Sequence, residues 1–327
     1  MSVKHHLIKI FVLLLCSSCG YAQSILNKLD PKVDTTYINL RYDNWSLRTV
    51  GTFKYQNLTI RDEKGNSVRY IPSDRTAVGL GFAYKFLVVD IGIRLLLARD
   101  FTSRFDLQGE LALQKHLIDV FVQRYKGFEA STEMTDSFRD DIRSWVIGIN
   151  YLYNFNSERL SIRSVLTGNR IQKKSAGSFV AGGFISVQDL KADTSVVAGN
   201  NGFNEAAQIN DSRLVMGGLQ GGAAYILKMT SHWYLFGGIM PGIGIMEGNA
   251  EGQTSYDIKL KPFFKLNTRA AVGYMGRKVY GGLLYSADHF FLDIDNQNKM
   301  DYNIGKIKLV FGYKFNSGIK LIDRVVD

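Results

Sequence analysis

Residues with catalytic or metal-binding side chains are few in this sequence. Of its five histidines, only His116, His232 and His289 lie beyond the first 22 residues. None of these three has a second histidine at the spacing that a shared metal ion requires. The sequence therefore predicts no metal site.

One short stretch holds the side-chain types of a hydrolase triad, as Ser286, Asp288 and His289. In an extended strand Ser286 and Asp288 point to one side and His289 to the other, so the three do not converge. We predict no catalytic residue here. A lipid-modifying hydrolase stays open as an alternative, which substitution of His116 or His289 would test.

Two glycine-rich stretches, 217–222 and 237–238, resemble phosphate-binding loops. Neither is followed by a Lys-Ser/Thr pair or by the start of a helix, which such loops need to hold a phosphate. Small residues for close packing explain these glycines better, and no cofactor is predicted.

The first 22 residues have the layout of a signal peptide. Lys4 and Lys9 provide a positive start, residues 8–15 are otherwise apolar, and small residues precede Gln23. Cleavage after residue 22 removes two lysines and no acid, which leaves a formal charge of 38 − 30 = +8. The chain is therefore predicted to be exported.

Both cysteines, Cys16 and Cys19, lie within this leader. A mature chain without cysteine has no disulfide and no thiolate ligand. Residues 15–19 also resemble a lipoprotein box that ends at Cys19, but Cys16 stands where that box has an aliphatic residue. We favour ordinary cleavage after Ala22.

Beyond the leader, apolar and polar residues alternate with a period of two. The pattern extends over residues 44–56, 104–114 and 306–315. Several such stretches reach about ten residues, which exceeds the usual soluble strand of roughly five or six and matches a tilted strand across a bilayer. Outside the leader, no stretch approaches the roughly 18 apolar residues of a spanning helix.

The opposite faces of these strands carry small or charged residues. Residues 76–86 alternate bulky side chains with Ala and Gly, and residues 87–97 set aliphatic residues against Asp90, Gly92 and Arg94. A closed barrel satisfies both faces, because lipid covers the outside and water or ion pairs fill the inside.

We therefore predict an all-β protein, a transmembrane antiparallel up-and-down β-barrel of about twelve strands, within a range of roughly 10 to 14. A soluble exported β-sandwich is the alternative. The expected segments are a signal peptide (1–22), a periplasmic lead-in (23–43), the barrel (44–315) and a C-terminal tail (316–327).

Parity within the last predicted strand assigns its two faces. Leu309, Phe311 and Tyr313 should face lipid, whereas Lys306, Lys308 and Lys314 should face inward. The sequence alone then predicts that Leu309→Arg impairs folding and that Lys308→Glu is nearly neutral for folding.

Six further charges are candidates for the lumen or its turns: Asp90, Arg94, Asp106, Glu110, Lys173 and Lys174. Lys173 and Lys174 lie between two strand patterns, 160–166 and 179–187. They form either a basic turn at the lipid headgroups or, if one lysine points inward, a charge cluster with the lumen acids. We favour the turn, because adjacent residues of a strand point in opposite directions.

Four stretches resemble the signatures of an uncharacterised, domain-of-unknown-function family of predicted bacterial outer-membrane β-barrel proteins. They are Tyr70-Ile71-Pro72, residues 79–85, Tyr125-Lys126-Gly127-Phe128 and Gln172-Lys173-Lys174-Ser175-Ala176-Gly177-Ser178. The resemblance covers about residues 34 to 315 and implies the barrel fold. It implies no substrate and no catalytic residue.

These observations predict an outer-membrane barrel of a Gram-negative envelope, without an assigned role. Passive transport, envelope structure and envelope lipid interaction are the leading functions, and a barrel that binds a partner through its loops is a further alternative. Expected partners are outer-membrane lipid and the barrel-assembly machinery. Nucleic acid is not expected, because the basic residues of this exported chain are dispersed over the strands.

Overall fold

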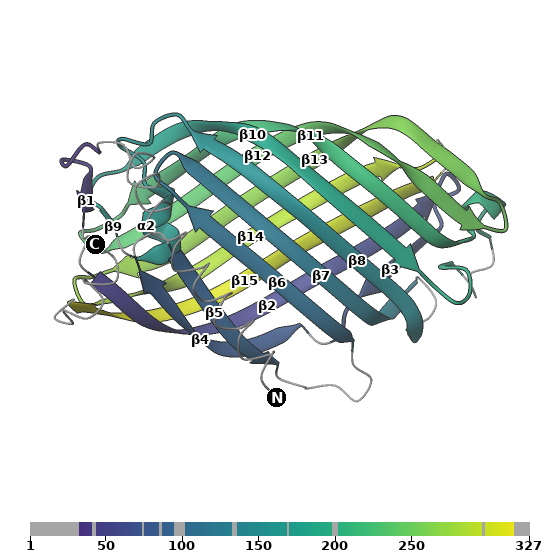
Figure 1. Ribbon diagram of the computed structural model, residues 1–327, viewed down its shortest axis with the longest axis horizontal. Helices are drawn as coiled ribbons and strands as arrows, with labels where there is room; N and C mark the ends of the chain where they lie inside the picture. Colours follow the sequence, from purple (N-terminus) through teal and green to yellow (C-terminus); the bar gives the residue numbers. More distant parts are fainter. Residues whose placement is uncertain are drawn as a thin grey trace, which may run out of the picture.

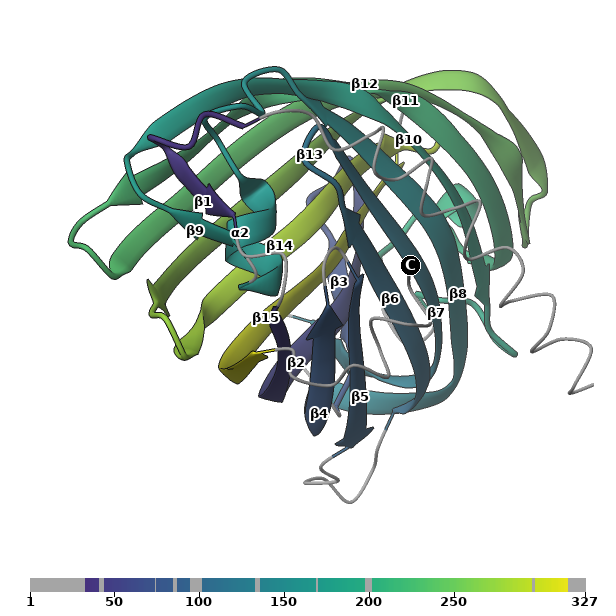
Figure 2. The same cartoon turned by 60° about the vertical axis from the view of Figure 1, so that its left-hand side comes forward.

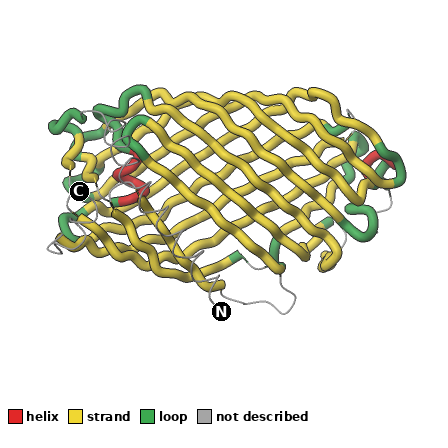
Figure 3. Tube along the Cα trace, viewed as in Figure 1, coloured by secondary structure: helices red, strands yellow, loops and turns green. Residues whose placement is uncertain are grey.

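The alternating stretches form one closed antiparallel sheet in the computed structural model of the protein (Figure 1). The structure describes residues 33–40, 44–73, 75–84, 87–94, 102–132, 136–168, 170–197, 202–295 and 298–316. Within these residues, thirteen strands belong to the large sheet, and β1 (Ile38–Leu40) pairs with β9 (Arg170–Gln172) in a second one. Strands make up nearly the whole wall (Figure 3).

The strands of the large sheet run up and down the wall in chain order. They are β2 (Asn44–Asp62), β3 (Ser67–Ile71), β4 (Thr76–Tyr84), β5 (Leu87–Arg94), β6 (Ser103–Ala112), β7 (His116–Ser131), β8 (Asp136–Asn154), β10 (Ala176–Lys191), β11 (Ile209–Lys228), β12 (Trp233–Gly252), β13 (Tyr256–Met275), β14 (Val279–Asp293) and β15 (Asn298–Asn316). β15 pairs with β2 over its full length, which closes the barrel.

β3 and β4 are two halves of one strand that runs antiparallel to β2. The first half of β2 pairs with β4, and its last residues pair with β3. The ladder is interrupted near Pro72, which has no N–H to donate. Because β5 and β6 are short, β3 pairs directly with β7 beyond them.

The wall therefore has twelve strands at the end where β2 begins and ten at the opposite end. We call these the N-terminal mouth and the far end. The sequence prediction of an up-and-down barrel of about twelve strands is confirmed.

Outward side chains define an apolar band around the barrel. On β15, Leu309, Phe311 and Tyr313 are exposed, as parity predicts. At the N-terminal mouth, Trp45 stacks on Phe315 with ring centroids 4.4 Å apart. Tyr55 lies ten residues further along β2. Ten residues of tilted strand rise about 25 Å, which matches the apolar band of outer-membrane barrels.

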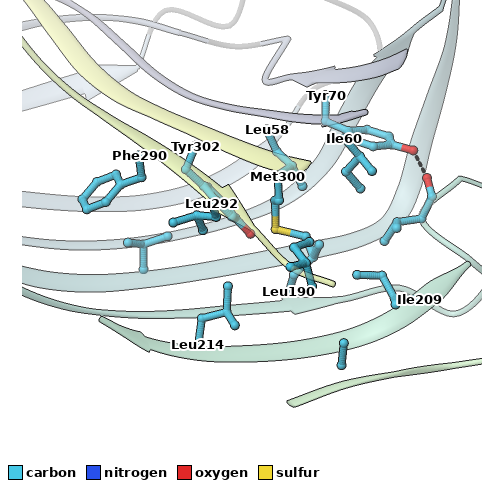
Figure 4. Packing of buried hydrophobic residues seen from close by; sticks show 14 of the residues in the cluster. Leu58, Ile60, Tyr70, Leu190, Ile209, Leu214, Phe290, Leu292, Met300 and Tyr302 are labelled. Atoms are coloured by element: carbon cyan, nitrogen blue, oxygen red, sulfur yellow. Dashed lines mark hydrogen bonds between the residues drawn. The ribbon is translucent and has the colours of Figure 1, made fainter. Parts of the chain in front are cut away.

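The far end of the lumen is filled by a hydrophobic cluster (Figure 4). Tyr70, Phe290 and Tyr302 are buried in it. Val196 and Phe203, from the connection between β10 and β11, also belong to this cluster. The Tyr70 hydroxyl donates a hydrogen bond to the Val196 carbonyl, so this connection folds inward over the lumen. A short 3₁₀ turn, η1 (Glu205–Ala207), precedes β11.

A short helix, α2 (Ile162–Thr167), lies inside the N-terminal mouth (Figure 2). The sequence prediction of a strand over 160–166 is therefore wrong. Leu160, Ile162 and Val165 are all buried in one cluster with inward residues of β10 to β13. A short apolar stretch that is buried in this way can be a helix as well as a strand. Gly168 ends the helix with φ 68°.

No helix among the described residues is long and apolar enough to span a membrane. The predicted signal peptide, both cysteines and the tail beyond Asn316 lie outside the described residues.

Candidate functional site

Ion pairs cross the lumen between α2 and the far-end cluster. Arg48 on β2 donates to both carboxylate oxygens of Asp90 on β5, with Nε to Oδ1 and Nη2 to Oδ2 each 2.7 Å. Lys308 on β15 donates to the same carboxylate at 2.9 Å, and Lys306 donates to Glu110 on β6 at 2.6 Å. Charges in a closed barrel need such partners, because unpaired charges are costly to desolvate.

Asp106 on β6 is held by three donors. Lys54 donates to its Oδ1 at 3.0 Å, and Gln123 and Tyr125 donate to its Oδ2 at 3.0 and 2.8 Å. This carboxylate therefore keeps two hydrogen bonds even when the lysine moves away.

Two further pairs lie on strands next to these, and we call the whole group of lumen ion pairs the ion-pair belt. Arg269 on β13 pairs with Asp119 on β7, and Lys265 lies 2.8 Å from Asp288 on β14. The Lys265 ammonium also lies 4.2 Å from the centroid of the Phe184 ring.

A glycine makes room for the Arg48–Asp90 pair. A Cβ at position 81 would clash with Asp90 Oδ1 and would lie 2.9 Å from Arg48 Cγ. The small residue therefore has a steric role. Gly81 also belongs to one of the stretches that carry the family resemblance.

The wall is not hydrogen-bonded between β5 and β6 in the described residues. β5 pairs with β4, and β6 pairs with β7. Thr102, just before β6, donates to the Gly127 carbonyl at 2.7 Å and accepts from the Ser73 N–H at 3.0 Å, next to the break at Pro72. We call the unpaired boundary between β5 and β6 the β5–β6 seam.

A cavity of about 320 Å³ lies at the seam. Its lining combines two faces of the sheet. The outward residues are Val78, Ile91, Phe105 and Leu107, and the inward ones include Lys54, Asp90, Arg104, Asp106, Glu110, Lys306 and Lys308. Ile91 is 75% exposed to the outside. Residues of both faces therefore line one cavity, which lies between the apolar outer surface and the ion pairs of the lumen.

The helix α2 lies next to the same ion pairs. Arg48 Nη1 donates to the Leu166 carbonyl at 3.1 Å, so one side chain joins the belt to the helix. A small cavity under α2 is lined by Glu110, Lys306 and Lys308, which also line the seam cavity. The helix therefore contacts the belt from inside the N-terminal mouth, and we call it the plug.

One group of family-motif residues fastens this plug to the wall. Gln172 donates to the Arg159 carbonyl at 2.6 Å and accepts from the Ser161 N–H at 3.0 Å. Asn156 donates through its side chain to the Gly177 carbonyl and through its N–H to the Ser178 hydroxyl, both at 2.8 Å. The Ser175 hydroxyl accepts from the Lys228 N–H at 2.9 Å.

The other motif residues lie beside the seam. Tyr125 holds Asp106, and Gly127 forms a β-bulge in β7 with φ 84°. A side chain at position 127 would also meet the Phe138 ring. Lys126 is exposed on β7. The motif thus divides between the plug and the seam.

The predicted turn lysines lie away from the lumen acids. Lys173 donates to the Thr35 carbonyl at 2.8 Å, and Lys174 lies 5.3 Å from the centroid of the Tyr37 ring. Both lysines are exposed at the N-terminal mouth, so neither one points into the belt. Nearby, hydrogen bonds from the hydroxyl and the N–H of Thr36 hold the pKa of Asp34 below its usual value.

Of the predicted lumen charges, Asp90, Asp106 and Glu110 point inward and meet in the seam cavity. Arg94 ends β5, but its side chain lies outside the described residues. Several basic and acidic partners in the belt were not among the predicted site residues, although Lys306 and Lys308 were predicted to face inward. The signal that could have identified them is their inward position in the alternating pattern. These residues are Arg48, Lys54, Arg104, Asp119, Lys265, Arg269, Asp288, Lys306 and Lys308.

The triad-type residues do not form a catalytic arrangement. Asp288 points inward to Lys265, whereas His289 stacks on the outward Phe291 with ring centroids 6.5 Å apart. His116 bonds to the Tyr151 hydroxyl at 2.9 Å. Within the described parts of the chain, no group of His, Cys, Asp and Glu is arranged to hold a metal ion.

A family model described as a domain of unknown function, DUF4421, matches residues 32–315. The chain belongs to this family. No curated protein matches the sequence of this DUF4421 barrel. The match agrees with the resemblance noted above and, like it, assigns no activity.

Three solved structures are similar to the DUF4421 barrel at low identity. OprG from Pseudomonas aeruginosa is 13% identical, with 85% of this chain and 99% of that chain covered and a TM-score of 0.25. Ail of Yersinia pestis is 10% identical, with 84% and 99% covered and a TM-score of 0.22. The Pseudomonas putida toluene transporter TodX is 10% identical, with 83% and 89% covered and a TM-score of 0.22.

The protein is thus a closed antiparallel β-barrel of a family whose description assigns no role. The low identities and TM-scores carry no argument about its function, which has to come from its own residues.

Proposed function

We propose that the DUF4421 barrel takes up membrane-dissolved molecules through its wall, at the β5–β6 seam, and is not an aqueous pore along its axis. This is a form of passive transport coupled to envelope lipid. This proposal rests on the seam cavity, which is lined by residues of both the outward and the inward face of the sheet.

Two features of the lumen support a lateral route. The far-end cluster and α2 occupy the two ends of the axis, and the ion-pair belt lies between them. By contrast, β5 and β6 leave unpaired edges toward the bilayer in the described residues. Unpaired backbone groups are costly in hydrocarbon, so a molecule whose polar head hydrogen-bonds to these edges would stabilise the seam.

Export precedes this function in the proposal. Residues 1–22 serve as the signal peptide, and the barrel-assembly machinery inserts the mature chain into outer-membrane lipid. Residues 23–43 and the N-terminal mouth face the periplasm. Short turns at this mouth, such as 113–115 and 276–278, agree with the short periplasmic turns of such barrels.

Cysteine labelling tests the lateral route, because both native cysteines lie in the proposed signal peptide. Ala77 on β4 points inward and lines the seam cavity, whereas Ala224 on β11 points inward and is buried in the cluster around α2. A lipid-soluble alkyl maleimide in vesicles should label Ala77→Cys much faster than Ala224→Cys. Equal labelling of the two variants would contradict a route through the seam.

Conductance separates the two transport modes. In planar bilayers, the refolded wild-type protein should show little ion conductance, whereas an axial pore would conduct steadily. Release of fatty acid from phospholipid, lost on substitution of His116 or His289, would favour a hydrolase instead. Binding to a partner protein without labelling or conductance would favour the loop-mediated reading.

A further inference from the structure

We infer that the seam cavity binds the anionic head of a single-chain amphiphile, with a carboxylate or phosphate held by Lys308 and Lys54 and the tail lying among the outward apolar residues. This inference deepens the proposed function and rests on it. It names the chemical class of the molecule that enters through the seam.

The cavity has an excess of positive charge. Among the described residues that line it, four are cationic (Lys54, Arg104, Lys306, Lys308) and three are anionic (Asp90, Asp106, Glu110), a formal charge of 4 − 3 = +1. Arg48, which is bonded to Asp90, raises the sum to +2. A site that is partly removed from water favours an anion that balances this excess.

The lysines also crowd one another. Lys54 on β2 stands directly opposite Lys306 on β15, and Lys308 follows two residues later on the same face. Like charges in opposed positions of neighbouring strands are destabilising. An anion placed among these ammonium groups would remove that repulsion.

Two of these lysines are able to exchange partners without leaving an acid unpaired. Asp90 keeps both hydrogen bonds from Arg48 when Lys308 turns to a ligand. Asp106 keeps Gln123 and Tyr125 when Lys54 does so. This redundancy matters, because a buried carboxylate that loses its partners costs more than a new contact returns.

Lys306 is less suited to the same exchange. It forms the ion pair with Glu110 at 2.6 Å, so its departure would take away the ammonium group to which this carboxylate is bonded. We therefore assign binding to Lys308 and Lys54, and a structural role to Lys306.

The lipid side of the cavity suits one hydrocarbon chain. Ile91, Phe105 and Leu107 flank the seam from outside, with exposures of 75%, 58% and 59%. The cavity volume of about 320 Å³ is at the lower end of the range for ligand pockets. A head with the first part of its tail fits this space, while the rest of the tail stays in the bilayer.

Binding of matched twelve-carbon probes tests the inference. Dodecanoate, dodecyl phosphate and dodecanol share one tail and differ in the head, so calorimetric titration of the refolded protein in a non-ionic detergent isolates the effect of charge. We expect both anions to bind at least about tenfold more tightly than the alcohol, the factor that one charge-assisted hydrogen bond gives. The stronger anion identifies the source as a fatty acid or a phosphate-bearing lipid.

Lysine variants locate the site. Lys308→Gln and Lys54→Gln should each weaken dodecanoate binding about tenfold and leave dodecanol binding unchanged. The control is Lys173→Gln, whose side chain is exposed at the N-terminal mouth and should have no effect. Each lysine is tested separately, so a folding defect in one variant leaves the other informative.

The outcomes separate the two proposals. If dodecanol binds as tightly as dodecanoate and Ala77→Cys is labelled, the lateral route stands and the anionic class is wrong. If Lys173→Gln weakens dodecanoate as much as Lys308→Gln does, the site is at the mouth and the inference fails. If no probe binds and Ala77→Cys stays unlabelled, the proposed function fails as well.

Discussion

Substitution of Leu309 by arginine tests the position of the barrel in the membrane. Leu309 is 61% exposed on the outer surface of β15, opposite Gly51 on β2. Gly51 lies six residues from Trp45 and four from Tyr55, the two aromatic borders of the apolar band. This location is close to the midplane, where an arginine costs about 2 to 4 kcal/mol in the free energy of unfolding.

The neighbouring residue provides a comparison, since Lys308 points inward. The sequence alone makes Lys308→Glu nearly neutral, but the structure changes this expectation. Lys308 Nζ lies 2.9 Å from Asp90, so a glutamate would add a third carboxylate beside Asp90 and Glu110. Two like charges about 4 Å apart repel by about 4 kcal/mol at an effective dielectric of about 20. Arg48 and Lys306 offset part of this repulsion.

Lys308→Met removes the charge without adding another. Because Asp90 keeps both hydrogen bonds from Arg48, we expect a loss of only about 1 kcal/mol. Leu309→Arg and Lys308→Glu should therefore both destabilise the protein more than Lys308→Met does.

Urea unfolding in phosphatidylcholine vesicles measures these differences, with fluorescence of the three tryptophans as the signal. Thr59→Arg is the matched control, because Thr59 lies opposite Asp301, beyond the apolar band. It should change the free energy of unfolding by less than about 0.5 kcal/mol. Equal losses for Leu309→Arg and Thr59→Arg would refute the assigned depth of β15.

Three further predictions concern export, the plug and the mouth. N-terminal sequencing of the mature protein should begin at Gln23, and a lipid on Cys19 would show instead that the lipoprotein box is used. Arg48→Ala should raise bilayer conductance above the wild-type level, because it removes the hydrogen bond to the last turn of α2; unchanged conductance would mean that the helix is held without it. Lys173→Ala and Lys174→Ala should each weaken flotation with anionic vesicles, by about 1 kcal/mol per lysine, and leave conductance unchanged, whereas a clear opening by either would contradict their position at the mouth.

Much of the barrel follows from the sequence, because alternation has a local cause. In a strand, side chains point to opposite faces, so the parity of residues 306–315 already separates Leu309 from Lys308. Strand length in the same way indicates a bilayer, and pairing of the first strand with the last follows from the cost of an unpaired edge in hydrocarbon. These inferences need only neighbours along the chain.

The helix α2 shows where local patterns are insufficient. The stretch 160–166 is too short for its sequence pattern to distinguish a strand from a helix, and nearly all of its residues are buried. Their conformation depends on the inner wall of β10 to β13, against which Leu160 and Ile162 pack. That wall comes from segments of the chain that lie later in the sequence.

The candidate site was decided by the tertiary structure. Parity places Asp90, Asp106 and Glu110 inside, but it does not tell which cations they meet, because Arg48 is 42 residues and Lys308 is 218 residues away from Asp90. The seam likewise depends on closure of the ring, since β3 pairs with β7 beyond the short strands β5 and β6. Composition and periodicity are properties of the chain itself, whereas partner choice and an opening in the wall arise only when distant strands come together.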